Sequence, residues 1–216
     1  GWIEGVLQAN AFITSGMAKR CLVIGAETLS RVVDAHDRDS MIYADGAGAA
    51  IIEGSDSETG MLSYESGTFA IDEANYLFFG KSYNQDLNPN TRYIKMYGRK
   101  IYEFALSKVP AAMKSCLDKS GIEINQVKKI LIHQANEKMD EAIIHRFYKL
   151  YGQTPPKDIM PMSINELGNS SVATVPTLYD LLTKGQIENH EIHKGDVIMF
   201  ASVGAGMNVN AFVYRY

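Results

Sequence analysis

The 216-residue chain is poor in cysteine and contains neither a long apolar run nor a cluster of basic residues. Its two cysteines, Cys21 and Cys116, cannot form a disulfide framework, which fits a reducing cytoplasm, and both are interpreted as buried small apolar residues. No apolar stretch approaches the roughly 20 residues of a membrane span. A net charge of −4 without a basic surface argues against nucleic-acid binding. We therefore expect a cytoplasmic globular protein that binds neither nucleic acid nor membrane.

The first residues also lack an initiating Met and a helix-capping side chain. Residues 2–16 are predicted to form a helix with apolar side chains nearly all round it, so this helix should be buried. A helix without an N-cap leaves its first N–H groups unpaired. We expect that further residues precede Gly1 in the native protein.

The rest of the chain alternates the patterns of strands and helices, which is typical of an α/β protein. The continuous apolar run at 21–26 predicts a buried strand, and residues 55–90, rich in Ser, Gly, Asn and Asp, predict a long excursion with little regular structure. Residues 92–119 predict a helix that Pro110 kinks or divides. Further strands are expected at 49–53, 128–132, 196–202 and 207–214, and further helices at about 136–151 and 170–184.

A weak internal repeat relates the two ends of the chain. Residues 1–54 and residues 170–216 both follow the order helix, apolar strand, Gly-Ala-Gly, strand. This order predicts a duplicated α/β unit with two stacked sheets and a buried helix between them. We assign residues 1–90 to an N-terminal half and residues 91–216 to a C-terminal half.

Three polar motifs fall where strands or helices begin or end. His133-Gln134-Ala135-Asn136 follows a strand, Gly168-Asn169-Ser170-Ser171 precedes a helix, and Gly204-Ala205-Gly206 separates the last two strands. Each alone has a structural explanation, as a helix cap or a tight turn. Together they indicate a binding crevice, because polar groups at strand ends of such sheets converge.

The motifs and their neighbours resemble the 3-oxoacyl-[acyl-carrier-protein] synthase III family of thiolase-like condensing enzymes. The matching stretches keep the family's order over nearly the whole chain: LVIGAETLSRVVD, ADGAGAA, MYGRKIYEFA, LIHQANEKM, GNSSVATVP and SVGAGMNVNAFVYRY. The resemblance implies a thiolase-like fold of αβαβα layers built from two similar halves, with its N-terminal part truncated here. It covers the C-terminal two-thirds of such an enzyme.

The family's reaction joins an acyl-CoA primer to malonyl-ACP, with loss of carbon dioxide, and starts fatty-acid biosynthesis. By resemblance, His133 and Asn169 donate hydrogen bonds to the malonyl thioester oxygen as charge develops on it. The backbone N–H of Ala205 would serve the second oxyanion. No cofactor is implied.

The family's nucleophilic cysteine belongs to a Cys-Ala-Gly-aromatic motif, and Gly1-Trp2 match the end of that motif. The nucleophile would then lie two residues before Gly1. Neither Cys21 nor Cys116 matches it, so we expect these 216 residues alone to be an inactive acyltransferase. The family forms homodimers through a strand expected upstream of Gly1, so the longer protein should be a homodimer and this chain should expose apolar surface.

Substrate contacts are expected on two surfaces. Arg38 matches an arginine that contacts the adenine end of CoA. Lys138 matches a residue that docks the acidic carrier protein, and it shares a helix face with His145 and Lys149, with Arg146 at the border. A solvated charged face is the alternative for this group.

Other functions are weaker candidates. His190 and His193 form an H-x-x-H pair without further ligands, so no metal site is predicted. P-loop, Rossmann and zinc spacings are absent. The main alternative is a related synthase that joins acyl chains for a specialised metabolite, and it would use the same His133 and Asn169.

Overall fold

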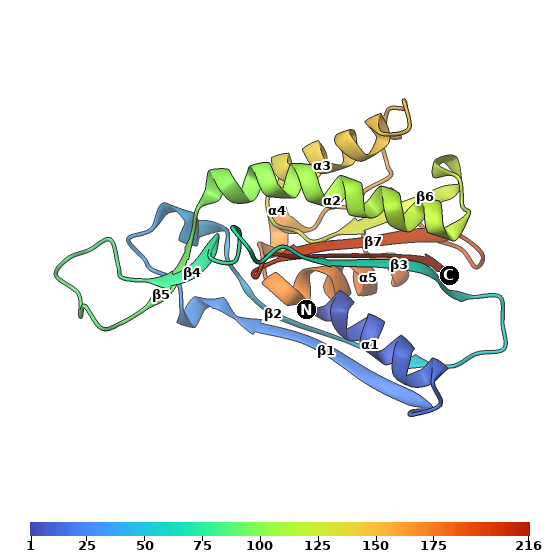
Figure 1. Ribbon diagram of the computed structural model, residues 1–216, viewed down its shortest axis with the longest axis horizontal. Helices are drawn as coiled ribbons and strands as arrows, with labels where there is room; N and C mark the ends of the chain where they lie inside the picture. The colour runs from blue at the N-terminus through green and yellow to red at the C-terminus, as the bar shows by residue number, and fades with distance from the viewer.

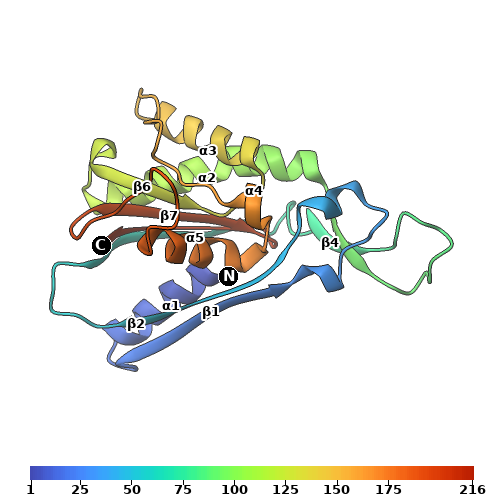
Figure 2. The same cartoon turned by 180° about the vertical axis from the view of Figure 1, so that it is seen from behind.

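The computed structural model describes residues 1–216 as four layers (Figure 1). A two-stranded sheet, β1-β2, forms one outer layer, and helices α1 and α5 separate it from the four-stranded sheet β3-β8-β7-β6. Helices α2 and α3 cover the other face of that second sheet (Figure 2). In chain order the elements are α1 (Trp2–Thr14), β1 (Arg20–Thr28), η1 (Leu29–Arg31), η2 (Arg38–Ile42), β2 (Asp45–Glu53), β3 (Gly60–Thr68), β4 (Leu77–Gly80), β5 (Tyr93–Met96), α2 (Gly98–Ser120), η3 (Ile124–Gln126), β6 (Val127–Ile132), α3 (Glu137–Lys149), α4 (Ile164–Leu167), η4 (Ser171–Ala173), α5 (Thr174–Thr183), β7 (Val197–Gly204) and β8 (Asn208–Arg215).

The inner layer forms because α1 and α5 present apolar side chains to both sheets. Trp2 and Ile3 of α1 pack with Leu178 of α5 and with Phe200 of β7. The rings of Phe200 and Phe212 stack with their centroids 4.3 Å apart. The predicted stacked sheets with a buried helix between them are therefore confirmed, and a second helix shares the layer.

The second sheet is mostly antiparallel, with one parallel pair. β6 runs parallel to β7, and β8 pairs antiparallel with both β7 and β3. The apolar faces of α2 and α3 bury the outer side of this sheet, with Met113, Ile143 and Phe147 at the centre of the core. The strand β6 ends at Ile132, and this places His133 at the edge of the sheet.

The repeat is seen in the topology. α1-β1-β2 and α5-β7-β8 are both a helix followed by two antiparallel strands. The two Gly-Ala-Gly motifs differ, however, because Gly46-Ala47-Gly48 lies inside β2 whereas Gly204-Ala205-Gly206 connects two strands. The expectation that the first motif only leads into the strand is wrong.

Glycines inside β1 and β2 let the segment around η4 approach the first sheet closely. A Cβ atom on Gly25 would lie 2.7 Å from the Val172 carbonyl oxygen, and one on Gly48 would lie 2.7 Å from Pro176. Gly25 and Gly48 face each other in the strand register. The absence of side chains on this face thus sets where η4 and the start of α5 sit.

Three further expectations are corrected by the structure. The strand at 21–26 is not buried on both faces. It belongs to the two-stranded sheet β1-β2, whose outer face leaves Leu22 63% exposed and Ile24 60% exposed. The excursion at 55–90 contains β3 and β4, and β3 pairs with β8 at the edge of the second sheet. Pro110 does not divide α2, which is one helix of 23 residues. The boundary between the two halves at residue 90 stays a prediction.

None of the helices combines the length and apolarity needed to cross a membrane.

A buried carboxyl group lies in α3. Asp140 is fully buried and neither of its oxygens makes a well-formed hydrogen bond. Burial raises the pKa of Asp140 to about 8, although the nearby N–H groups of Ala135 and Asn136 favour the ionised form. Asp140 is therefore protonated in the folded protein at neutral pH.

The close approach at Gly48 predicts a stability cost. Gly48→Ala should lower the free energy of unfolding by about 1–3 kcal/mol, because the new methyl group must displace Pro176. Denaturant unfolding measures this change. Gly54→Ala is the matched control, since its Cβ would make only an ordinary 3.4 Å contact with Ile13. Equal stability of the two variants would contradict the assigned contact.

Asp140 predicts a pH dependence of stability. Between pH 4 and pH 8 the folded protein holds a proton on Asp140 that the unfolded chain releases, so the free energy of unfolding should fall as pH rises across this window. Asp140→Asn should remove this component, and the variant should gain stability relative to the wild type as pH rises. Glu137→Gln, exposed at the start of the same helix and without an effect on the pKa of Asp140, is the control. Parallel pH profiles of wild type and Asp140→Asn would rule out the protonated carboxyl.

Candidate active site

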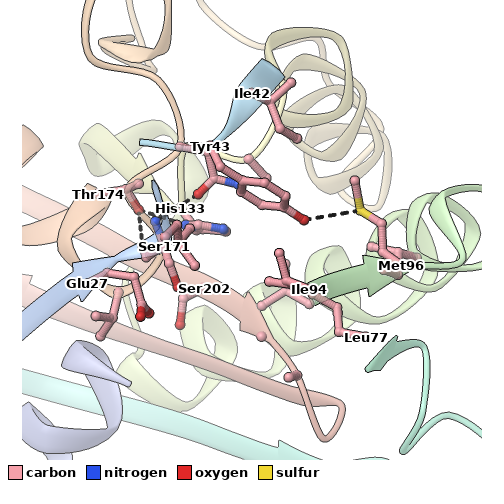
Figure 3. Close-up of a pocket in the computed structure, with 18 of the residues that line it drawn as sticks. Glu27, Ile42, Tyr43, Leu77, Ile94, Met96, His133, Ser171, Thr174 and Ser202 are labelled. Atoms are coloured by element: carbon pink, nitrogen blue, oxygen red, sulfur yellow. Dashed lines mark hydrogen bonds between the residues drawn. The ribbon is translucent and has the colours of Figure 1, made fainter. Parts of the chain in front are cut away.

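The three sequence motifs meet at one cavity of about 910 Å³. His133, Asn169 and Ala205 line it together with Gly1 and Trp2 at the start of α1. Figure 3 shows His133 beside Thr174 and Ser171, with Tyr43, Ile94 and Met96 on the other side of the space. The fold therefore brings the predicted residues together at the N-terminal end of α1.

His133 is held at the end of β6 by both its backbone and its ring. Its N–H donates to the Ala201 carbonyl (2.9 Å), which continues the β6-β7 pairing. Its Nδ1 lies 2.7 Å from Thr174 Oγ1. Nε2 has no hydrogen-bond partner in the chain and is open to the cavity. Burial lowers the pKa of His133 to about 4, with a smaller contribution from the Gly1 ammonium group, so the ring is neutral at pH 7.

Asn169 is fixed by a short parallel bridge to Tyr43. The Asn169 N–H donates to the Ile42 carbonyl (2.8 Å), and the Asn169 carbonyl accepts from the Ala44 N–H (2.9 Å). The Ser171 N–H donates to Asn169 Oδ1 (2.9 Å), which orients the amide. The Asn169 NH2 group is left without a protein partner, and it is open to the cavity as a donor.

Ala205 lies in the connection between β7 and β8. Its carbonyl accepts from Asn208 Nδ2 (2.7 Å), and its N–H makes no hydrogen bond within the chain. Reciprocal backbone bonds between Phe69 and Met207, at 2.8 and 3.0 Å, attach this connection to the end of β3. The cavity is thus lined by three polar groups without a hydrogen-bond partner in the chain: His133 Nε2, the Asn169 NH2 group and the Ala205 N–H.

Neither cysteine reaches this cavity. Cys21 lies in β1, and Cys116 is buried in α2, where burial raises the pKa of its thiol. No group of three or more His, Cys, Asp or Glu side chains is arranged to hold a metal ion. The donors therefore have no thiol beside them within these residues.

The far wall of the cavity is apolar and comes partly from the predicted excursion, which contains β4, and partly from residues 93–96, which form β5 and not the start of the helix predicted at 92–119. The β4-β5 hairpin supplies Leu77, Phe79, Ile94 and Met96. Only the aromatic content of this stretch signalled its role in the sequence. Tyr43 closes the wall, with its hydroxyl 3.6 Å from Met96 Sδ.

A buried ion cluster fixes the hairpin to the rest of the protein. The Lys95 ammonium lies 2.6 Å from Asp34 and 2.8 Å from Asp37. Although burial opposes ionisation of Asp34, hydrogen bonds from Lys95, from the Tyr83 and His36 N–H groups and from Ser82 hold its pKa well below its usual range. Removing one member would leave an unpaired buried charge, so the cluster makes the position of the hairpin dependent on residues 34–37.

The remaining predicted site residues lie outside this cavity. Arg38 is exposed at the start of η2, and Arg31 rather than Arg38 lies in the cavity wall. Lys138, His145, Arg146 and Lys149 are all exposed on α3, and the Arg146 guanidinium also donates to the Leu106 carbonyl (3.3 Å). Their roles in binding CoA and a carrier protein stay predictions.

The alternating α and β layers and the shared cavity define a thiolase-like protein. Residues 1–69 match the profile of 3-oxoacyl-[acyl-carrier-protein (ACP)] synthase III, and residues 117–216 match the profile of its C-terminal part. The chain belongs to this family.

Curated relatives named β-ketoacyl-[acyl-carrier-protein] synthase III align with the whole chain. The protein from Porphyra umbilicalis is 33% identical over 224 residues and that from Levilactobacillus brevis is 28% identical over 222 residues. The crystal structure of 3-oxoacyl-[acyl-carrier-protein] synthase III from Aquifex aeolicus is 29% identical, with a TM-score of 0.83, over 100% of this chain and 64% of that chain. The chain spans 65% of the length of the two curated relatives.

The neutral state of His133 predicts an NMR titration. The His133 ring resonances should stay constant from pH 8 to pH 5 and should move only near pH 4, whereas an ordinary imidazole titrates near 6.5. Comparison with the spectrum of His133→Gln assigns the resonances. A midpoint above pH 6 would contradict the neutral ring.

Proposed function

We propose that this chain carries the decarboxylation and condensation site of a 3-oxoacyl-[acyl-carrier-protein] synthase that starts fatty-acid biosynthesis. Its substrates would be an acyl-CoA primer and malonyl-ACP. The observation that carries the proposal is that His133 Nε2 and the Asn169 NH2 group line one cavity and have no hydrogen-bond partner in the chain. Membership of the synthase III family supports it.

The chemistry needs these donors when malonyl-ACP loses carbon dioxide. The bond between the malonyl methylene carbon and its carboxylate breaks, and the electron pair moves to give an enolate with its charge on the thioester oxygen. His133 through Nε2–H and Asn169 through its amide N–H would hold that oxygen. A neutral imidazole suffices, because it still donates one hydrogen bond. Donors fixed beforehand stabilise such charge most strongly, and both are fixed here.

The condensation step needs a second oxyanion site and an acylated thiol. The enolate carbon attacks the acyl thioester carbonyl, a carbon–carbon bond forms, and the thiolate leaves. The Ala205 N–H would hold the oxygen of this second intermediate. The acyl group would be carried by the cysteine of a Cys-Ala-Gly-aromatic motif ahead of Gly1, since Cys21 and Cys116 lie elsewhere. The 216 residues alone would then not accept an acyl group.

Partner contacts follow from the exposed surfaces. Lys138, His145, Arg146 and Lys149 would place positive charge toward the acidic carrier protein on the helix that begins next to His133. Arg38 would contact the nucleotide of CoA outside the cavity. The longer protein would act as a homodimer.

This proposal predicts the activity of two forms of the protein. The 216-residue chain should take no label from radiolabelled acetyl-CoA, whereas a longer form that includes the cysteine motif should be acylated and should condense with malonyl-ACP. In the longer form, His133→Ala and Asn169→Ala should each lower malonyl-ACP decarboxylation by about 10²–10³-fold, the usual cost of one oxyanion donor, while self-acylation continues.

Two exposed residues provide controls for these substitutions. His193→Ala and Asn125→Ala remove the same side-chain types far from the cavity lining and should leave both steps unchanged. Label on the short chain would show that the nucleophile is misplaced. Loss of acylation with decarboxylation spared in either cavity variant would show that the donor roles are misassigned.

A further inference from the structure

The hydroxyl of Thr174 lies between the ring of His133 and a backbone carbonyl. Thr174 Oγ1 is 2.7 Å from His133 Nδ1 and 3.0 Å from the Ser171 carbonyl oxygen. Thr174 is 3% exposed, so water does not compete for the hydroxyl. Figure 3 shows this hydroxyl at the edge of the imidazole ring, between His133 and Ser171.

The single hydroxyl proton links the position of Thr174 to the state of the ring. A neutral imidazole carries its proton on Nδ1 or on Nε2. If the Thr174 proton points to Ser171, Nδ1–H must donate to Oγ1 and Nε2 faces the cavity as an acceptor. If the proton points to Nδ1, the ring proton lies on Nε2 and faces the cavity as a donor.

Two observations favour donation to Nδ1. The Ser171 carbonyl already accepts the backbone N–H of Thr174 at the junction of η4 and α5, so it does not depend on the hydroxyl. Nδ1 has no other partner in the chain, and its contact with Oγ1 is the shorter of the two. When the hydroxyl donates to Nδ1, the Ser171 carbonyl therefore keeps the Thr174 N–H as a donor, and no buried acceptor is left unpaired.

We propose that Thr174 is a positioning residue that donates to His133 Nδ1 and thereby holds the ring proton on Nε2, facing the cavity. The use of that proton on a thioester oxygen rests on the function proposed above, whereas the tautomer itself does not. Ser171 helps to position both side chains, because its N–H orients the Asn169 amide and its carbonyl lies beside the Thr174 hydroxyl. The turn at residues 171–174 thus orients the hydrogen-bonding groups of both His133 and Asn169.

The experiment is nitrogen-15 NMR of the 216-residue chain at pH 7, because the shifts of Nδ1 and Nε2 distinguish protonated from unprotonated ring nitrogens. The wild type should show His133 with a protonated Nε2 and an unprotonated Nδ1. Thr174→Val keeps the shape but removes the hydroxyl, and it should give a mixture of tautomers. Thr174→Ser should restore the wild-type spectrum. Protonated Nδ1 in the wild type, or an unchanged tautomer in Thr174→Val, would overturn the proposal.

Thr183→Val is the matched control. The Thr183 hydroxyl lies at the same distance, 3.0 Å, from a carbonyl oxygen three residues earlier, that of Asp180, but it has no hydrogen bond to a histidine. It should leave the His133 spectrum unchanged, and a change equal to that of Thr174→Val would count against a specific role.

Decarboxylation by the longer form separates the two proposals. Thr174→Val should slow it about tenfold, less than loss of the donor itself, and Thr174→Ser should recover most of the rate. If His133→Ala leaves decarboxylation intact while the tautomer is as stated, the proposed function fails and the role of Thr174 stands. If Thr174→Val changes the tautomer without slowing decarboxylation, a positioning role in the reaction is excluded.

Discussion

The site depends on the close contact between the glycine face of β1-β2 and the segment from Asn169 to Pro176. Side chains on Gly25 or Gly48 would collide with Val172 and Pro176. Because they are absent, η4 and the start of α5 lie directly on the first sheet, and Asn169 joins Tyr43 through a backbone bridge. The same segment reaches His133, at the edge of the second sheet, through Thr174. One packing constraint therefore links the two sheets at the position where their donors meet.

The electrostatic character of the site follows from this packing. The side chains of Asn169 and His133 each have one end bonded to the protein and the other end free, Asn169 being bonded through Oδ1 and His133 through Nδ1. Burial keeps the imidazole neutral, so the site presents directed hydrogen-bonding groups on these two residues without a charge on the ring. The charged groups that are buried nearby, Lys95 with Asp34 and Asp37, are paired and hold the apolar hairpin in place.

Much of this arrangement could be predicted from the sequence. Apolar periodicity located the strand that ends at His133 and the helix that starts after Asn169, and the order of motifs indicated one crevice. Residues whose role depends on a distant partner could not be found in this way. Gly48 is explained only by Pro176, and the strand β3 only by its pairing with β8. The sequence indicated for Thr174 only a place near the start of a helix, because His133, whose ring it contacts, is 41 residues away in the chain. The exposed face of β1 was missed because a continuous apolar run does not tell how many neighbours a strand has.

The central claim is that His133 and Asn169 both donate to one thioester oxygen. Isotope-edited infrared spectroscopy of the 216-residue chain with malonyl-ACP, labelled with carbon-13 at the malonyl thioester carbonyl, tests it most directly, since hydrogen bonds lower the carbonyl stretching frequency. We predict a frequency below that of free malonyl-ACP in water, a partial return in His133→Ala and in Asn169→Ala, and a full return when both are replaced. A bound carbonyl that absorbs as it does in water, or one that neither substitution shifts, would contradict it.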